Sequence, residues 1–132
     1  MVNKTCPCGS SLPFHACCEP IILGKRDAIT CLELMRSRYV AFTRDNVDFL
    51  LKSHHPTTRP LKERKRIKKW AESVKWMGLS ILSTKDGGIK DDTGYVEFRA
   101  LYLEDGQIQQ IHENSLFKRE NKRWFYVLGV HF

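Results

Sequence analysis

The chain has no long apolar segment, no low-complexity tract and no excess of acidic residues. None of its apolar stretches approaches the ~18–20 residues that are needed to span a membrane. It opens without the basic segment and apolar run of a secretory signal peptide. It also has no glycine-rich phosphate-binding loop and no motif that joins a nucleophile to a base. We therefore expect a cytoplasmic protein that does not insert into membranes, and no motif indicates an enzyme class.

Length and charge set further limits. The 132 residues suffice for one domain with a small appendage, and 42% of them are hydrophobic, which allows a core of useful size. Lys and Arg number 22 against 15 Asp and Glu, so the formal net charge is +7. Net charge bears on association rather than on fold, and this sign favours acidic surfaces or nucleic acid as partners.

The positive charge is concentrated in one stretch, which we call the basic segment. It contains Arg59, Lys62, Arg64, Lys65, Arg66, Lys68, Lys69 and Lys75, against Glu63 and Glu72. A solvated helix face is the usual meaning of such a run. The functional alternative is a binding surface for RNA, the ribosome or an acidic protein. Its candidate contact residues are Arg59, Lys62, Arg64, Lys65, Lys68 and Lys69.

Four of the five cysteines fall within the first eighteen residues, as Cys6-Pro-Cys8 and Cys17-Cys18. Zinc takes four ligands, and structural sites favour four cysteines, or three cysteines with a histidine. We therefore expect these four thiols to bind a structural zinc ion with no position left for a reactive water. Two alternatives stay open: the thiols could pair as disulfides, or His15 could replace one cysteine.

Hydrophobic periodicity predicts three helices between 27 and 74. The first starts at a cap on Asp27 and continues to about 42, with Cys31 as a small buried hydrophobe. The second covers about 47–51 after a cap on Asp45 or Asn46. The third covers 61–74, and the residues that we expect it to bury are Leu61, Ile67, Trp70 and Val74.

The remaining chain reads as antiparallel strands over 76–84, 95–103, 108–118 and 123–130, with turn clusters between them. Helices followed by such a meander make an α+β fold. In the second strand, alternation places Val96, Phe98, Ala100 and Tyr102 on one face.

The same alternation sorts the candidate catalytic residues. Glu113 shares a face with Ile111 and Phe117, whereas His112 lies on the opposite face. A buried carboxylate needs a partner, which Arg36 or Arg38 from the long helix could supply. The catalytic candidates are thus Glu113, His112, Arg36 and Arg38, and other polar candidates are Glu97, Arg99, Ser115 and Tyr126. A structural ion pair that fastens helix to sheet is the simpler interpretation.

The N-terminal run Cys6-Pro-Cys8-Gly9-Ser10, with Phe14 and Cys17-Cys18, resembles the SEC-C zinc motif of the SecA preprotein translocase tail. That motif has Gly at the position of Ser11 and His at the position of Cys18, and the cysteine keeps the ligand count. Further segments are similar to the YchJ-type family over nearly the whole chain. These are Leu34-Met35-Arg36-Ser37-Arg38-Tyr39, Val96-Glu97-Phe98, His112-Glu113, and Trp124 with Tyr126.

The resemblance implies a SEC-C-like zinc motif over residues 1–24 and a nuclear-transport-factor-two-like domain over residues 25–132. It implies a cystatin-like curved antiparallel sheet wrapped around about three helices, and a homodimer that can form through an exposed sheet face. It implies a fold and a metal but no reaction.

Two functions are compatible with this sequence. The first is a non-enzymatic module whose zinc knuckle and basic segment dock a protein, the ribosome or RNA. The second is a small-molecule binder or an enzyme of lyase, isomerase or hydrolase type, with a pocket between sheet and helices. A cavity with a polar floor would favour the second function. A cavity filled by Phe98, Phe117, Trp124 and Tyr126 would exclude it.

Overall fold

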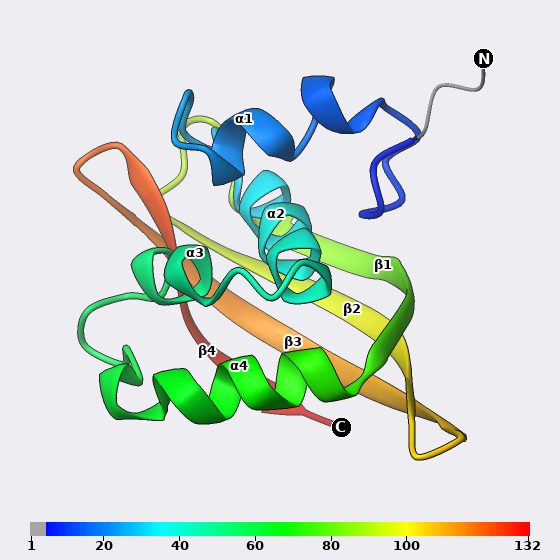
Figure 1. Ribbon diagram of the computed structural model, residues 1–132. Helices are drawn as coiled ribbons and strands as arrows, with labels where there is room; N and C mark the ends of the chain where they lie inside the picture. The colour runs from blue at the N-terminus through cyan, green and yellow to red at the C-terminus, as the bar shows by residue number, and fades with distance from the viewer. Residues whose placement is uncertain (1–4) are drawn as a thin grey trace.

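The structure is a computed structural model and describes residues 5–132. Helices occupy the first half of the chain and strands the second (Figure 1). The helical elements are η1 (Phe14–Ala16), α1 (Glu19–Ile22), α2 (Cys31–Thr43), α3 (Val47–Lys52), η2 (Leu61–Glu63) and α4 (Arg64–Ser73). The strands are β1 (Lys75–Asp86), β2 (Thr93–Glu104), β3 (Gln107–Glu120) and β4 (Arg123–His131). The predicted α+β class and its order of elements are confirmed.

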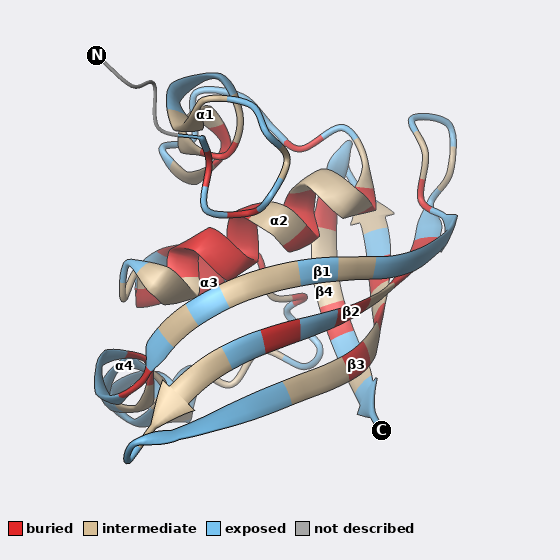
Figure 2. Ribbon diagram, turned by 90° about the vertical axis from the view of Figure 1, so that its right-hand side faces the viewer, coloured by how far each residue is buried: buried red, intermediate tan, exposed pale blue. Residues whose placement is uncertain are grey.

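The four strands form one antiparallel sheet in the order β1-β2-β3-β4, which is a simple meander. The pairing register shifts twice along β1 and once between Leu116 and Phe117 of β3. Such irregularities bend strands and increase their twist. The sheet is accordingly curved, and α2, α3 and α4 all lie on its concave side (Figures 1 and 2).

Helix α2 crosses the concave face, and eight of its thirteen residues are buried. Thr30 caps the helix, because its side chain accepts a hydrogen bond from the Glu33 N–H at 3.1 Å. The cap that we expected at Asp27 is therefore wrong. Asp27 lies outside the helix, where its carboxylate is 3.8 Å from the Arg123 guanidinium.

The other two helices follow the predictions in part, since Val74 is buried as expected but Ile67 and Trp70 are only half-buried. Asn46 caps α3 by accepting a hydrogen bond from the Phe49 N–H at 3.1 Å, which confirms one of the two expected caps. The segment expected as one helix over 61–74 starts as a 3₁₀ turn and becomes α-helical at Arg64. Leu61 lies in that turn, out of phase with the buried side of α4. It is 66% exposed, so its predicted burial is wrong.

The inner face of the sheet carries the predicted side chains. Val96, Phe98 and Ala100 are buried from β2, where Tyr102 is half-buried, and Phe117 is fully buried from β3. The burial of Cys31 is also confirmed. A Cβ on Gly94 would lie 2.8 Å from the Cys31 sulfur, so the helix start packs tightly against the β1–β2 hairpin.

The N-terminal segment packs on α2. Cys6, Cys8, Cys18 and Ile21 belong to the same buried cluster as Leu34 of α2. A domain boundary at residue 24 stays a prediction. In the part of the chain that the structure describes, every helix is too short or too polar to cross a bilayer.

Candidate functional site

The four N-terminal cysteines form a compact cluster. The sulfur atoms of Cys6, Cys8, Cys17 and Cys18 all lie within 4.8 Å of one another. The Cys8–Cys17 and Cys17–Cys18 sulfur separations are 3.6 and 3.8 Å. Four sulfurs at about 2.3 Å from a central zinc ion in tetrahedral geometry would be separated by about 3.8 Å. The cluster therefore has the dimensions of a tetrahedral thiolate site.

The two alternative arrangements of these cysteines are not found. A disulfide requires two sulfurs about 2.05 Å apart, and all five cysteines are free. Among the described residues, the group that could hold a metal contains four cysteines and does not include His15, which is exposed.

Helix α2 contacts the cysteine cluster through the side chain of Arg36. Arg36 Nη1 donates a hydrogen bond to the Cys8 carbonyl at 2.7 Å and lies 3.9 Å from the Cys8 sulfur. The Ser10 hydroxyl lies 3.1 Å from the Cys17 sulfur. Cationic groups and hydrogen-bond donors beside sulfur favour the thiolate form. Arg36, a candidate partner of Glu113, thus contacts the cysteine cluster instead.

The pKa values of Cys8 and Cys18 are shifted in opposite directions. A hydrogen bond from Cys18 holds the pKa of Cys8 far below its usual value. The same contact, with burial, raises the pKa of Cys18, whereas the buried Ser37 hydroxyl acts in the opposite direction. Metal-bound cysteines are thiolates, so a bound cation would replace these shared protons. The donor set fits a thiolate-binding metal ion.

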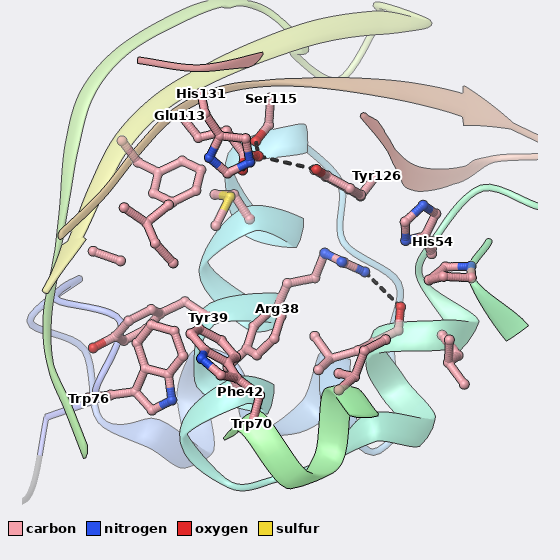
Figure 3. A pocket seen from close by; sticks show the side chains of 18 of the residues that line it. Arg38, Tyr39, Phe42, His54, Trp70, Trp76, Glu113, Ser115, Tyr126 and His131 are labelled. Atoms are coloured by element: carbon pink, nitrogen blue, oxygen red, sulfur yellow. Dashed lines mark hydrogen bonds and ion pairs between the residues drawn. The ribbon is translucent and has the colours of Figure 1, made fainter. Parts of the chain in front are cut away.

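A cavity of about 550 Å³ lies between the concave face of the sheet and helices α2, α3 and α4 (Figure 3). Its apolar lining includes Met35, Tyr39, Phe42, Leu50, Trp70, Trp76, Phe98, Ala100 and Ile111. Phe117 and Trp124 are packed into the core, and Phe98 and Tyr126 line the wall. The four aromatic residues therefore do not fill the cavity.

Three aromatic side chains close one end of the pocket. The ring of Trp70, from α4, stands edge-on to that of Trp76 at 5.5 Å between centroids. Phe42, from α2, lies 6.3 Å from Trp70 and 5.6 Å from Trp76. Rings that pack edge to face hold one another in place. This end of the pocket is thus lined by aromatic rings that pack against one another.

Glu113 forms the polar end of the pocket (Figure 3). Its carboxylate accepts hydrogen bonds from the hydroxyls of Ser115 and Tyr126, the latter at 3.2 Å, and lies 3.1 Å from His131 Nε2. The side chain is buried, as the alternation predicted. A Cβ at Gly129 would lie 2.0 Å from the carboxylate, so the glycine on β4 provides its space.

Arg38 enters the pocket from α2 but does not pair with Glu113. Its Nη1 donates to the Leu50 carbonyl at 2.8 Å and to the Ser53 hydroxyl at 2.7 Å. Its guanidinium carbon lies 4.5 Å from the centre of the Tyr126 ring. Burial lowers the pKa of Arg38 to about 10, which leaves it a cation at neutral pH. The predicted ion pair of Glu113 with Arg36 or Arg38 is wrong, because Tyr126 lies between the two charges of the pocket.

The outer face of the sheet carries the other polar candidates. His112 Nε2 lies 2.7 Å from Glu97 Oε2, and this contact lowers the pKa of Glu97. Arg99 is exposed on the same face. His112 and Glu113 therefore point to opposite sides, as the alternation predicted. The pocket contains Arg38, Glu113, Ser115 and Tyr126 from the sequence candidates.

Two histidines of the pocket were not candidates from sequence. His131 is directly opposite Glu113 in the β3–β4 register, and His54 packs edge-on against Tyr126 at 5.0 Å between ring centroids. The alternation of a strand places His131 on the same face as Gly129. It does not predict which residue of β3 lies opposite His131, because that depends on the strand register. His54 lies in a segment without periodicity, so no sequence signal could have found it.

Several side chains of the basic segment form ion pairs or hydrogen bonds within the protein. Arg64 pairs with Asp48 of α3, Arg66 with Glu63 at 2.9 Å, and Lys68 with Glu72 at 4.0 Å. Arg59 donates to the carbonyls of His54 and Lys52. The side chains of Lys62, Lys65, Lys69 and Lys75 are exposed.

A curved antiparallel sheet with a pocket against its helices defines a nuclear-transport-factor-two-like domain, and the cysteine cluster defines a SEC-C motif. Residues 30–129 match the family model described as the YchJ middle NTF2-like domain, and residues 3–20 match the SEC-C motif. The chain belongs to the YchJ family, whose related proteins are called UPF0225 proteins.

Several relatives resemble this chain along most of its length. A UPF0225 protein of Geobacter sulfurreducens is 42% identical over 97% of this chain and 80% of its own length. One from Pectobacterium carotovorum is 38% identical over 98% of this chain and 85% of its own.

Two solved structures share the fold. The solution structure of a SEC-C motif containing protein from Rhodopseudomonas palustris aligns with a TM-score of 0.89 at 30% identity, over 98% of this chain and 99% of the other. The crystal structure of a SEC-C motif containing protein from Psychrobacter arcticus aligns with a TM-score of 0.82 at 28% identity, over 95% of this chain and 81% of the other.

The pocket histidine makes stability depend on pH. Burial, and then the charge of Arg38, lower the pKa of His54 from 6.5 to about 4. Between these pH values the unfolded chain binds a proton that the folded protein does not, so the stabilisation is complete above 6.5 and is lost as the pH falls towards 4. We expect His54→Gln to lose less stability than the parent over this window in urea unfolding. Curves that fall in parallel would contradict the assignment.

Proposed function

We propose that the protein is a small-molecule-binding domain whose ligand occupies the cavity between the sheet and helices α2 to α4. The observation that carries the proposal is an open cavity of about 550 Å³ with aromatic walls and a few buried polar groups. Sites for small molecules typically have volumes of about 300–1,000 Å³, mostly apolar linings and a few well-placed polar groups. This cavity has each of these properties.

The buried charges support this proposal. Arg38 and Glu113 are both 7% exposed, and a buried charge lowers stability unless it is paired. An apolar core at this position would be at least as stable, so stability alone does not account for two separated charges around a cavity. A function in binding accounts for them. A lyase, isomerase or hydrolase reaction would require proton transfer, for which Glu113 and His131 are the candidate groups.

Filling the cavity should weaken the binding of a neutral apolar dye. We expect the parent to bind N-phenyl-1-naphthylamine with increased dye fluorescence. The variant Ala100→Leu should bind it about tenfold more weakly, which is about 1.4 kcal/mol, because the larger side chain occupies volume that the dye would fill. The matched control is Leu101→Phe, which adds atoms on the outer face of the same strand. Equal affinities of two folded variants, or no binding by the parent, would contradict the proposed function.

We also propose that the cysteine cluster holds zinc as a structural ion. Thiolate ligands in tetrahedral geometry favour zinc over harder divalent cations, and four protein ligands leave no position for a reacting water. The cluster lies on α2 through Arg36, so the ion would fasten the N-terminal segment to the domain.

Metal analysis tests the zinc proposal. We expect one zinc ion per chain in the purified protein and its loss in Cys18→Ser. The melting temperature should then fall by about 5 °C or more, because the metal-binding free energy contributes to folding. Cys31→Ala is the matched control, since Cys31 is also buried but lies outside the cluster. Retention of zinc by Cys18→Ser, or its loss from Cys31→Ala, would disprove the assignment.

A second candidate function is contact with RNA through the basic segment, which the exposed lysines of α4 and its flanks support. We expect affinity for single-stranded RNA to fall steeply with salt, because phosphate contacts release counterions. The triple variant Lys62→Glu, Lys65→Glu, Lys69→Glu should bind more weakly than the control Lys85→Glu, Lys90→Glu, Lys122→Glu, which changes net charge equally. Equal losses would argue against a defined surface.

A further inference from the structure

The hydrogen-bond donors of Arg38 are only partly used. A guanidinium has five N–H donors, and it stays charged in proteins. Nη1 makes the bonds to Leu50 and Ser53, while Nε and Nη2 have no acceptor among residues 5–132. Figure 3 shows the bonded end of the guanidinium directed towards α3, with the side chain reaching into the pocket. Nε and Nη2 form the side-on edge that a carboxylate binds with two parallel hydrogen bonds.

Glu113, the acid of the pocket, does not accept hydrogen bonds from Nε or Nη2 of Arg38. Glu113 already receives hydrogen bonds from Ser115 and Tyr126 and lies 3.1 Å from His131 Nε2, so its oxygens are engaged by three neighbours. The ring of Tyr126 has Arg38 on its face and Glu113 at its hydroxyl, which keeps the two charges apart. Nε and Nη2 of Arg38 thus have no acceptor among the described residues, and an anionic acceptor would complement them.

Apart from Glu113, the described residues that line the pocket include no acidic side chain. His54 is held neutral at neutral pH by its lowered pKa. Arg66 of α4 also lines the pocket, but its guanidinium is exposed and already pairs with Glu63 at 2.9 Å, so it does not offer a free charge to the ligand. An anion that reached Arg38 would gain a charge-assisted bond to a buried group, where such bonds are stronger than at the surface.

The apolar end of the same pocket determines the rest of the ligand. Phe42, Trp70 and Trp76 line this end with packed aromatic rings, and Tyr39 packs edge-on against Trp76. Aromatic rings bind aromatic surfaces in offset or edge-on contacts. We propose that the pocket binds an aromatic carboxylic acid, with its carboxylate on the Nε and Nη2 edge of Arg38 and its ring against Phe42, Trp70 and Trp76. This inference rests on the proposed function of the pocket.

A matched ligand pair tests the inference. Naphthalene-2-carboxylate and naphthalene-2-carboxamide have the same ring and nearly the same shape, and they differ in charge. Calorimetric titration of the full chain at neutral pH should show that the acid binds about tenfold or more tightly than the amide, because hydrogen bonds to charged groups are the stronger ones. Equal affinities would overturn the inference.

Three variants test which positive charge causes the preference for the acid over the amide. Arg38→Met should bind acid and amide equally, and Arg38→Lys, which keeps the charge without the two-pronged edge, should show a much reduced preference. Arg66→Gln is the control and should keep the preference of the parent. Loss of the preference in Arg66→Gln, or its persistence in Arg38→Lys, would overturn the role of Arg38. If Arg38→Met does not fold, the results for Arg38→Lys and Arg66→Gln still test the role of Arg38.

The outcomes also separate the inference from the proposed function. Binding of the neutral dye without preference for the acid would overturn the inference and leave the pocket as a binding site. Failure of the dye, the acid and the amide to bind the folded parent would overturn both.

Discussion

The structure depends on the burial of α2 between the cysteine cluster and the concave face of the sheet. Val40 and Ala41 are completely buried on this helix, which contacts α1, α3 and three of the four strands. Residues two positions apart on a helix point in nearly opposite directions. For this reason Arg36 reaches the Cys8 carbonyl while Arg38 reaches the pocket. One helix thus carries the supports of both candidate sites, and a displacement of α2 would disturb them together.

The separation of two buried charges is the main feature of the pocket. A direct ion pair between Arg38 and Glu113 would have compensated both groups and closed the space between helix and sheet. Instead Tyr126 lies between them, and each group is held by its own set of neighbours. Such an arrangement lowers stability relative to an apolar core, and it leaves donors available to a ligand. The bulged, curved sheet keeps the cavity open, because a flatter sheet would bring β2 and β3 closer to α2.

Local sequence predicted the elements well and their ends less well. Alternation assigned the faces of Phe98, Glu113 and Phe117 correctly, because a strand with one buried face repeats every two residues. Thr30, not Asp27, caps α2, and Glu33 three residues later accepts a hydrogen bond from the Ile29 N–H, a local capping pattern that hydrophobic periodicity does not include. Helix α1 has four residues, too few for any periodic signal. Leu61 was assigned to a helix face that the 3₁₀ turn does not continue.

The sequence by itself determined the cysteine cluster, the α+β order of elements and the face on which each strand residue lies, because these follow from spacing along a few neighbouring residues. Tertiary structure alone decided that Arg36 belongs to the cysteines, that His131 lies opposite Glu113, and that the aromatic residues surround a cavity instead of filling it. These properties depend on strand register and on the fit of side chains distant in sequence. A local pattern carries no information on either, since the same alternation is compatible with several registers and packings.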